Sequence, residues 1–276
     1  MKKAKLYLVQ LPIISITIFF ICCVIAALIY PGSHKELINY QSDYYSFTHN
    51  FLSDLGSLKT NTDETNPAII QEDNTPSMLL FNGSLILIGG TLMLFYFHFK
   101  KVFPLIKDTS KSIFYSRITM PLGLLAGFFY AGVGFVPHDL HFEAHVFFAN
   151  NAFLTLFFLC VLHGLTIYHS SVLSNNYVLG YVAFCFVLFV YLRIIFFGPQ
   201  IGPGIIYSEE DLMLQVIAQK SIVLTFMAAF LHQVYGFNLL FTNKRNLIKK
   251  TELFQITFSL LQKKARLYLV VLCLYY

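Results

Sequence analysis

Charged residues are scarce in this chain. They make up 12% of its 276 residues, against roughly 25% in a typical soluble domain. Apolar and aromatic residues make up 57%, and the mean hydropathy is +0.65. This shortage of charge excludes a soluble globule, a disordered chain and a nucleic-acid-binding protein. The net charge of +5 does not change that conclusion, because the charges sit in short clusters between apolar runs.

Cysteine motifs and internal repeats are missing as well. The five cysteines include no CxxC spacing, and no pair of them flanks a loop. All five lie inside apolar stretches, so we expect packing or lipid-facing residues rather than a disulfide framework or a metal site. The absence of a repeat disfavours a transporter built from inverted repeats. The cysteines are Cys22, Cys23, Cys160, Cys185 and Cys273.

Long apolar runs, by contrast, occur six times. Each approaches or exceeds the roughly 20 apolar residues that a helix needs to cross the hydrocarbon core. The runs lack the two-residue alternation of strands, and a helix pairs its own backbone groups within the lipid. The sequence therefore predicts an all-α protein, a polytopic transmembrane bundle of six helices. The spans run approximately over residues 6–30, 78–99, 118–136, 144–168, 177–197 and 212–241, within a membrane domain of residues 1–246.

The first run follows Met-Lys-Lys-Ala-Lys, which is a good start for a signal peptide. Its apolar stretch is longer than the roughly 7–15 residues of a signal peptide, and no clean A-x-A site follows Ala26 and Ala27. We therefore expect an uncleaved first span.

Basic residues fix the predicted orientation. With the N-terminus inside, residues 2–5, 100–117 and 244–250 place 12 of the 19 lysines and arginines on the inner side. The outer segments hold only Lys35, Lys59 and Arg193. This asymmetry follows the positive-inside rule. It predicts a cell (cytoplasmic) membrane protein with the N-terminus inside and one long outer loop, residues 31–76.

The last residues do not fit a seventh span. Residues 253–261 and 267–276 are apolar but short, and the segment between them is basic. We interpret residues 247–276 as an inner-side tail that lies at the membrane interface, with a non-native end as the alternative.

Polar residues gather near the outer ends of the predicted spans. Polar groups at membrane depth are costly, so each calls for a partner or a role. We therefore predict a polar cluster just below the outer headgroups that binds a lipid or a protein partner. Its predicted binding residues are His49, Asn82, His138, Asp139, Lys220 and Arg193.

A catalytic interpretation of the same cluster uses a metal. His141 and His145 are four residues apart, so on a helix they share one face and are candidate ligands for Zn²⁺. Ser53, Asp54 and Glu143 are then the candidate catalytic residues. Zinc-bound water would attack a lipid ester or amide. This HxxxH pair lacks the glutamate of HExxH, so the sequence favours no metal, no cofactor and a non-enzymatic role.

Local structural roles explain part of the cluster equally well. Asp139 can cap the fourth span, and Asp54 can cap a turn that Gly56 closes. Lys220 either extends its ammonium outward or pairs with an outer carboxylate. We expect His163, His232 and Gln233 to form hydrogen bonds between helices, with a proton path as the alternative. A proton-coupled carrier would depend on Lys220, His163 and His232.

Small residues predict close helix packing. Gly123 and Gly127 form a GxxxG motif inside an apolar helix. The motif supports contact between spans or between subunits, so a homo-oligomer stays an open alternative.

Several short motifs also occur in a recognisable order. They are the first span, His49-Asn-Phe-Leu-Ser-Asp-Leu-Gly56, Phe81-Asn82-Gly83 with Gly89-Gly90, a span closing in Gly134-Phe-Val-Pro137, and a helix opening with His145-xxx-Ala149. In this order the chain, over about residues 6–241, resembles the domain of unknown function 998 family of six-span prokaryotic membrane proteins. It is more distantly similar to the eukaryotic damage-regulated autophagy modulator proteins.

The resemblance implies a six-helix bundle with a large first outer loop and both termini inside, and it implies no activity. It further implies that one outer-side cluster contains Ser53, Asp54, Gly56, Asn82, Pro137 and His145.

Overall fold

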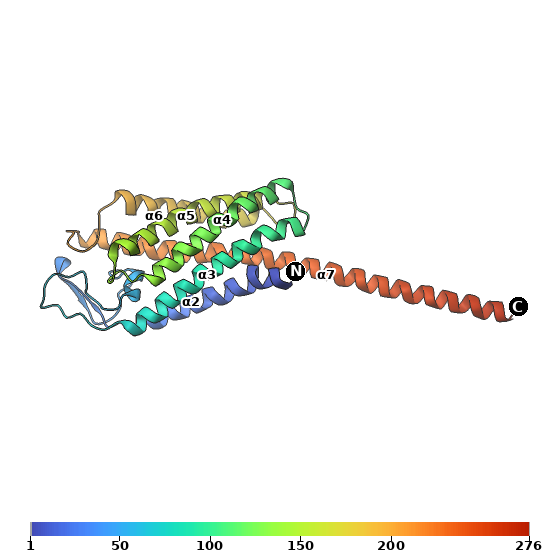
Figure 1. Ribbon diagram of the computed structural model, residues 1–276, viewed down its shortest axis with the longest axis horizontal. Helices are drawn as coiled ribbons and strands as arrows, with labels where there is room; N and C mark the ends of the chain where they lie inside the picture. Colours follow the sequence, from blue (N-terminus) through green and yellow to red (C-terminus); the bar gives the residue numbers. More distant parts are fainter. Residues whose placement is uncertain (1, 276) are drawn as a thin grey trace.

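The computed structural model describes residues 2–275 of the chain, with side chains described for residues 2–243. The predicted interfacial tail, residues 247–276, lies outside the residues whose side chains are described. Figure 1 shows the helices packed side by side, with the first loop gathered at one end of the bundle. Following the predicted orientation, we call that end the outer end.

Six helices are long and apolar enough to cross a membrane. The first begins as α1 (Lys2–Lys5), continues through the π-helical turn η1 (Leu6–Gln10) and ends as α2 (Leu11–Leu28). The chain is therefore a multi-pass membrane protein with the predicted six-helix architecture. The others are α3 (Thr75–Leu105), α4 (Ser110–Phe135), α5 (Phe142–Tyr168), α6 (Asn176–Phe197) and α7 (Glu209–Tyr275), of which Glu209–Asn243 is the membrane-length part.

The helices extend beyond the predicted apolar spans because polar residues form their last turns. α3 continues through Lys100 and Lys101 to Leu105, well past the predicted end at residue 99. α4 begins at Ser110 rather than at residue 118, since the Thr109 hydroxyl caps the helix by accepting a bond from the Ser112 amide at 3.1 Å. Hydropathy marks only the part of a helix that lies in hydrocarbon.

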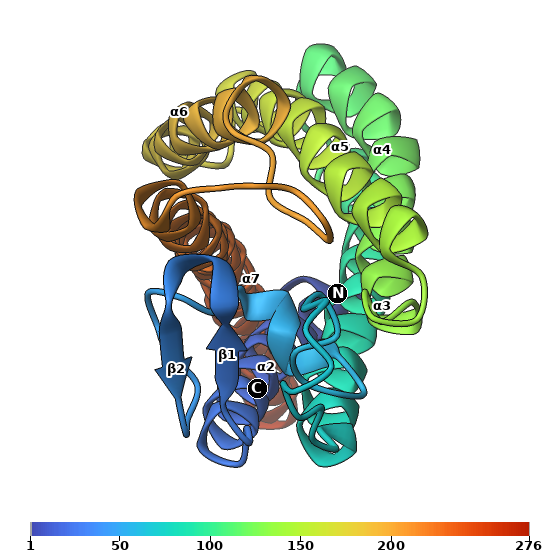
Figure 2. The same ribbon diagram turned by 90° about the vertical axis from the view of Figure 1, so that its left-hand side faces the viewer.

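The helices form a ring in chain order (Figure 2). α2 packs on α3, each later helix packs on the one before it, and α7 contacts α2 to close the ring. Between α3 and α6, short connections between antiparallel neighbours favour this order. As a result, the side chains at the ring's centre come from all six helices.

Glycines set the closest helix contact, between α3 and α4. The backbones of Gly89 and Gly127 face each other, and a Cβ on either residue would overlap the carbonyl oxygen of the other. Gly123 lies against the ring of Tyr96 in the same way. The GxxxG motif therefore packs α4 onto α3 within one chain.

Aromatic side chains fill the inner half of the ring. Phe95 of α3 packs edge-to-face on Phe230 and Phe237 of α7, at centroid distances of 4.8 and 6.0 Å. His163 of α5 lies among these rings, and its Nδ1 is 3.0 Å from the Tyr96 hydroxyl. This confirms the predicted hydrogen bond between helices at His163. Aromatic side chains from α3, α5 and α7 thus pack together in the inner half of the ring.

The first loop folds over the outer end of the ring. Its strands β1 (Ser33–Lys35) and β2 (Tyr40–Ser42) pair antiparallel around the 3₁₀ turn η2 (Glu36–Ile38). The only other regular element of this loop is the 3₁₀ turn η3 (Leu52–Gly56).

Residues 43–51, which precede η3, form no helix. Polar side chains bond the local backbone instead. The Asn50 carbonyl side-chain oxygen accepts from the Ser46 amide at 2.9 Å, and the Ser46 hydroxyl accepts from the His49 amide at 3.2 Å. Such bonds compete with helical hydrogen bonding.

Candidate functional site

A cavity of about 310 Å³ lies at the outer end of the ring, and we call it the outer cavity. Its walls come from the first loop, α5, α6, α7 and the Gly-Pro-rich connection between α6 and α7, which crosses over the ring in Figure 2. The wall is mixed in character, with aromatic residues such as Phe51, Phe142 and Tyr191 beside polar ones. The polar wall residues include Lys35, Asp54, His138, Asp139, Asn150 and Gln200.

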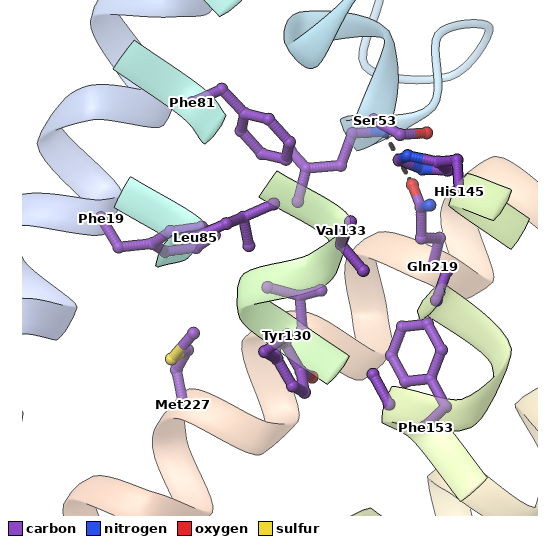
Figure 3. Close-up of a pocket in the computed structure, with 14 residues that line it drawn as sticks. Phe19, Ser53, Phe81, Leu85, Tyr130, Val133, His145, Phe153, Gln219 and Met227 are labelled. Carbon is purple, nitrogen blue, oxygen red and sulfur yellow. Dashed lines mark hydrogen bonds between the residues drawn. The ribbon is translucent and has the colours of Figure 1, made fainter. Parts of the chain in front are cut away.

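A smaller apolar pocket of about 60 Å³ adjoins the outer cavity (Figure 3). Its wall is made largely of side chains such as Phe19, Leu85 and Met227, from α2, α3 and α7. Four residues line both spaces, so they mark the junction of the polar and the apolar region. They are Ser53, His145, Ala149 and Gln219.

His145 is the most buried titratable group at this junction, with 8% of its surface exposed. Its Nδ1 lies 2.7 Å from the carbonyl oxygen of Val136, the residue that ends α4. A carbonyl oxygen only accepts, so Nδ1 carries the proton in this bond. In the neutral ring, Nε2 is then a free acceptor.

Ser53 approaches the junction from the first loop. The turn that carries it is fixed on both sides, because Asp54 accepts from the Phe51 amide at 3.0 Å and Gln219 accepts from the Leu52 amide at 2.7 Å. In Figure 3, Ser53, His145 and Gln219 gather at the upper right of the pocket, and Phe19, Leu85 and Met227 lie on its left. The loop therefore places Ser53 in the wall of the same two spaces as His145.

Asp54 and Lys220 belong to one network that runs through Asn50. The Asn50 side-chain amide donates to Asp54 at 3.0 Å, and the Lys220 ammonium donates to the Asn50 backbone carbonyl. The ammonium also lies 5.3 and 5.1 Å from the ring centres of Tyr45 and Phe47. Lys220 thus holds the loop through a backbone carbonyl and aromatic rings, and it does not form the direct carboxylate pair that was considered.

Lys35 supplies a buried positive charge to the outer cavity wall, with 6% of its surface exposed. Burial disfavours the charged ammonium, but the carboxylates of Asp54 and Asp63 outweigh it and raise the pKa of Lys35. Its Nζ is 3.9 Å from Asp63. The sequence predicts Lys35 only as a basic residue of the outer loop, since nothing in its local pattern marks it as buried.

His138 and Asp139 line the outer cavity from the turn between α4 and α5. The rings of His138 and His145 are 5.8 Å apart, edge to face. Asp139 accepts from the Leu58 and Lys59 amides at 2.8 and 3.1 Å, so it fastens the first loop and does not cap α5 as expected. Its other oxygen and the Nδ1 of His138 are buried without a partner among the described residues.

Asn82 joins the first loop to α3. Its side-chain amide donates to the Gly56 carbonyl at 2.9 Å, and a Cβ on Gly56 would overlap the Asn82 side chain. Only glycine fits at this close approach. Of the cluster that the resemblance implied, Ser53, Asp54 and His145 line the outer cavity, and Gly56 and Asn82 form its support behind the loop.

Six predicted site residues do not line the cavity, namely Asn82 and Lys220, described above, and His49, His141, Glu143 and Arg193. His49 bonds Glu209 at 3.0 Å and stacks on Tyr40, so it clamps the loop to the start of α7. Glu143 is exposed, and Arg193 is exposed with its guanidinium 4.8 Å from the Phe197 ring centre. His141 caps α5, accepting from the Ala144 amide at 3.2 Å.

The predicted zinc pair is not set up as a shared helix face. His141 precedes the first turn of α5 with a backbone φ of −154°, so it does not continue the helical face of His145. Among residues 2–243, no group of three or more His, Cys, Asp or Glu side chains is arranged to hold a metal ion. The zinc hypothesis stays a prediction.

Two glutamines of α7 are polar residues of the outer cluster for which the sequence predicted no specific partner. Gln215 and Gln219 stand four apart in an apolar helix and face the same side. Gln215 donates to the Pro199 carbonyl, and Gln219 bonds the first loop. Their spacing was the available signal, since two amides on one face of a span call for partners.

Comparisons of this chain with protein-family models, curated proteins and solved structures found no match. The resemblance to the domain of unknown function 998 family therefore stays a prediction, and the candidate function depends on the geometry of the site.

Proposed function

We propose that this multi-pass membrane protein binds a single amphipathic lipid at its outer end, in the cell membrane. The observation that carries the proposal is the direct junction of a polar cavity with an apolar pocket at Ser53, His145, Ala149 and Gln219. Such a junction suits a molecule with a polar headgroup and an apolar chain. The pocket of about 60 Å³ takes only a few carbons of that chain.

The charges of the outer cavity favour a headgroup without net negative charge. Three carboxylates, from Asp54, Asp63 and Asp139, share the wall with the single ammonium of Lys35. An anionic headgroup would meet an excess of like charge. Hydroxyl or amine groups can instead donate to the unpartnered Asp139 oxygen and the acceptor nitrogen of His145.

The aromatic packing in the inner half of the ring supports a binding function over a carrier. Phe95 and Phe99 pack edge-to-face on Phe237 there, and none of the three lines the outer cavity. The residues that a proton-coupled carrier would use lie in separate surroundings, with Lys220 at the first loop and His163 inside the aromatic layer.

Fluorescence quenching tests this proposal, because the chain contains no tryptophan. We would replace Tyr191, which lines the outer cavity and packs 4.9 Å from Phe153 of the apolar pocket. In Tyr191→Trp, a brominated monoacylglycerol added in detergent should quench the fluorescence saturably near one molecule per protein. The anionic probe, a brominated fatty acid, should bind at least tenfold more weakly.

A matched variant controls for lipid that coats the outside of the bundle. Phe237→Trp places the only tryptophan in the aromatic layer, where 1% of the Phe237 surface is exposed. Its fluorescence should be insensitive to the same probe. Equal quenching in both variants, or no saturable quenching in Tyr191→Trp, would overturn the binding proposal.

A further inference from the structure

The three polar residues at the junction have the roles that acyl transfer needs. An imidazole with a free nitrogen, a hydroxyl and an amide donor line the same two spaces. Each comes from a different part of the chain, namely α5, the first loop and α7. The hydrogen bonds that each side chain already forms indicate which of its atoms stay available for a ligand.

His145 is oriented as a base. Its Nδ1 is held by the Val136 carbonyl at 2.7 Å, in the position where other nucleophile–base pairs have an orienting acceptor. That bond leaves the lone pair of Nε2 without a partner among the described residues, on a side chain that is 8% exposed. A buried, oriented and unpartnered acceptor at the edge of a cavity can take a proton from a bound hydroxyl.

Ser53 supplies the hydroxyl. Within the described part of the chain its side chain has no hydrogen-bond partner, whereas Ser57 of the same loop donates to the Asp54 carbonyl at 2.8 Å. The turn beneath Ser53 is fixed by the bonds of the Phe51 and Leu52 amides. Ser53 therefore lines the junction from a fixed backbone, which is what a nucleophile requires.

Gln219 supplies a donor. Its Oε1 is occupied by the Leu52 amide, so the two protons of its Nε2 are directed away from that bond. A neutral amide beside a reacting carbonyl stabilises the negative charge that develops on oxygen. Figure 3 shows the Gln219 amide beside His145 and close to Ser53.

We infer that Ser53 and His145 form a nucleophile–base pair that cleaves an acyl ester of the bound amphiphile, with Gln219 holding the carbonyl oxygen. This inference rests on the proposed lipid binding and deepens it. An ester links the polar and apolar parts of such a lipid, so a ligand seated across the junction places its carbonyl beside these three residues.

This ester cleavage uses only the two side chains and water, and it involves no change of oxidation state. The Ser53 oxygen bonds the carbonyl carbon while its proton passes to Nε2 of His145. The bond from that carbon to the alcohol oxygen then breaks, and the alcohol leaves with the same proton. Water next attacks the acyl-serine with His145 again as base, releasing a fatty acid and restoring Ser53.

A serine-directed fluorophosphonate with an alkyl chain tests the inference on the wild-type protein in detergent. Mass spectrometry of the digested protein should find one adduct, located on Ser53. No adduct, or an adduct on another residue, would overturn the inference. This readout does not depend on the folding of any variant.

Three variants then separate the roles. His145→Gln keeps a donor for the Val136 carbonyl and removes the base, so labelling should slow by about 10²-fold or more. Gln219→Glu keeps the acceptor for the Leu52 amide and removes the donor, so turnover of monoacylglycerol should fall by about 10²-fold. Ser57→Ala should label at the wild-type rate. Unchanged labelling of His145→Gln would contradict the assigned base.

Binding and cleavage fail in different ways. Ser53→Ala introduced into Tyr191→Trp should keep the saturable quenching by brominated monoacylglycerol and lose all labelling. Retained quenching with no labelling of the wild type would leave lipid binding standing and overturn the cleavage. Loss of quenching in Tyr191→Trp itself would overturn the binding proposal, and with it the substrate assigned here.

Discussion

The ammonium group of Lys220 on α7 donates a hydrogen bond to the backbone carbonyl of Asn50 in the first loop. The two residues are 170 positions apart in the chain. Because the Asn50 side chain also donates to Asp54 at 3.0 Å, this bond ties a helix of the ring to the turn that carries Ser53. The one lysine inside a predicted span therefore acts as an anchor for the loop over the outer cavity.

Removing this anchor should loosen the first loop. Lys220→Met keeps the apolar stem and leaves the buried Asn50 carbonyl without its charged donor. We expect a loss of about 1–3 kcal/mol in the free energy of unfolding. Thermal unfolding in detergent and the rate of proteolysis within residues 31–74 measure it.

The control for Lys220 is Lys59→Met, because Lys59 lies in the same loop with an exposed side chain. It should unfold within about 0.5 kcal/mol of the wild type. Equal effects of the two substitutions would contradict the anchoring role.

Gly56 and Asn82 should respond to mutation as a coupled pair. Gly56→Ala forces a methyl group into the Asn82 side chain and onto Phe81, so we expect destabilisation of about 1–3 kcal/mol. Asn82→Ala removes the donor to the Gly56 carbonyl and costs about 1–3 kcal/mol. The double variant should be more stable than the sum of the two losses, because it removes one of the clashing groups. Chemical unfolding of all four proteins gives the coupling, and strict additivity would argue against direct contact.

Gly90 of α3 and Gly127 of α4 should differ sharply in the substitutions that they tolerate. A methyl group at Gly90 meets nothing within 4 Å, whereas one at Gly127 overlaps the Gly89 carbonyl and the Met93 side chain. Gly90→Ala should therefore stay within about 1 kcal/mol of the wild type or gain stability from helix propensity. Gly127→Ala should lose about 1–3 kcal/mol. Thermal unfolding midpoints compare the two, and a reversed order would refute the close packing of α3 on α4.

The fold was largely predictable from the sequence because hydrocarbon imposes one rule on every span. Each run needs about 20 apolar residues and satisfies its own backbone, so six runs predicted six helices. The helix ends were less predictable. Residues such as Lys100 and Ser110 continue a helix outside the lipid, where hydropathy carries no signal.

The candidate site was predictable in part. Burying a polar group at membrane depth costs free energy, and this indicated that His145, Asn82 and Lys220 need partners. Each of them has a partner in the structure. Which partner each has depends on the path of the first loop. The turn at Leu52–Gly56 of this loop is fixed by side chains that are distant in the sequence, such as Gln219. Lys35 gave no local signal, because only the folded loop buries it.

Asp108, in the connection between α3 and α4, predicts a stability change with pH. Burial disfavours its charged form, but hydrogen bonds from Ser170, Ser171 and Thr109 outweigh it and lower the pKa of Asp108 below its ordinary 3.8. Two of these bonds, from the Ser170 hydroxyl and the Ser171 amide, are 2.5 and 2.8 Å long. They fasten the end of α3 to the turn that follows α5.

The sign of the effect follows from this direction. A carboxyl whose pKa is lower in the folded protein stabilises it above the unfolded pKa, and the benefit disappears as the pH falls through the folded value. The contribution of Asp108 to the thermal unfolding midpoint should therefore be constant from pH 7 to about pH 4. Below about pH 4 the midpoint should fall. Asp108→Asn should lower the midpoint at pH 7 and show a smaller further drop below pH 4. If the substitution left the acid limb of the profile as steep as in the wild type, another carboxyl would account for it.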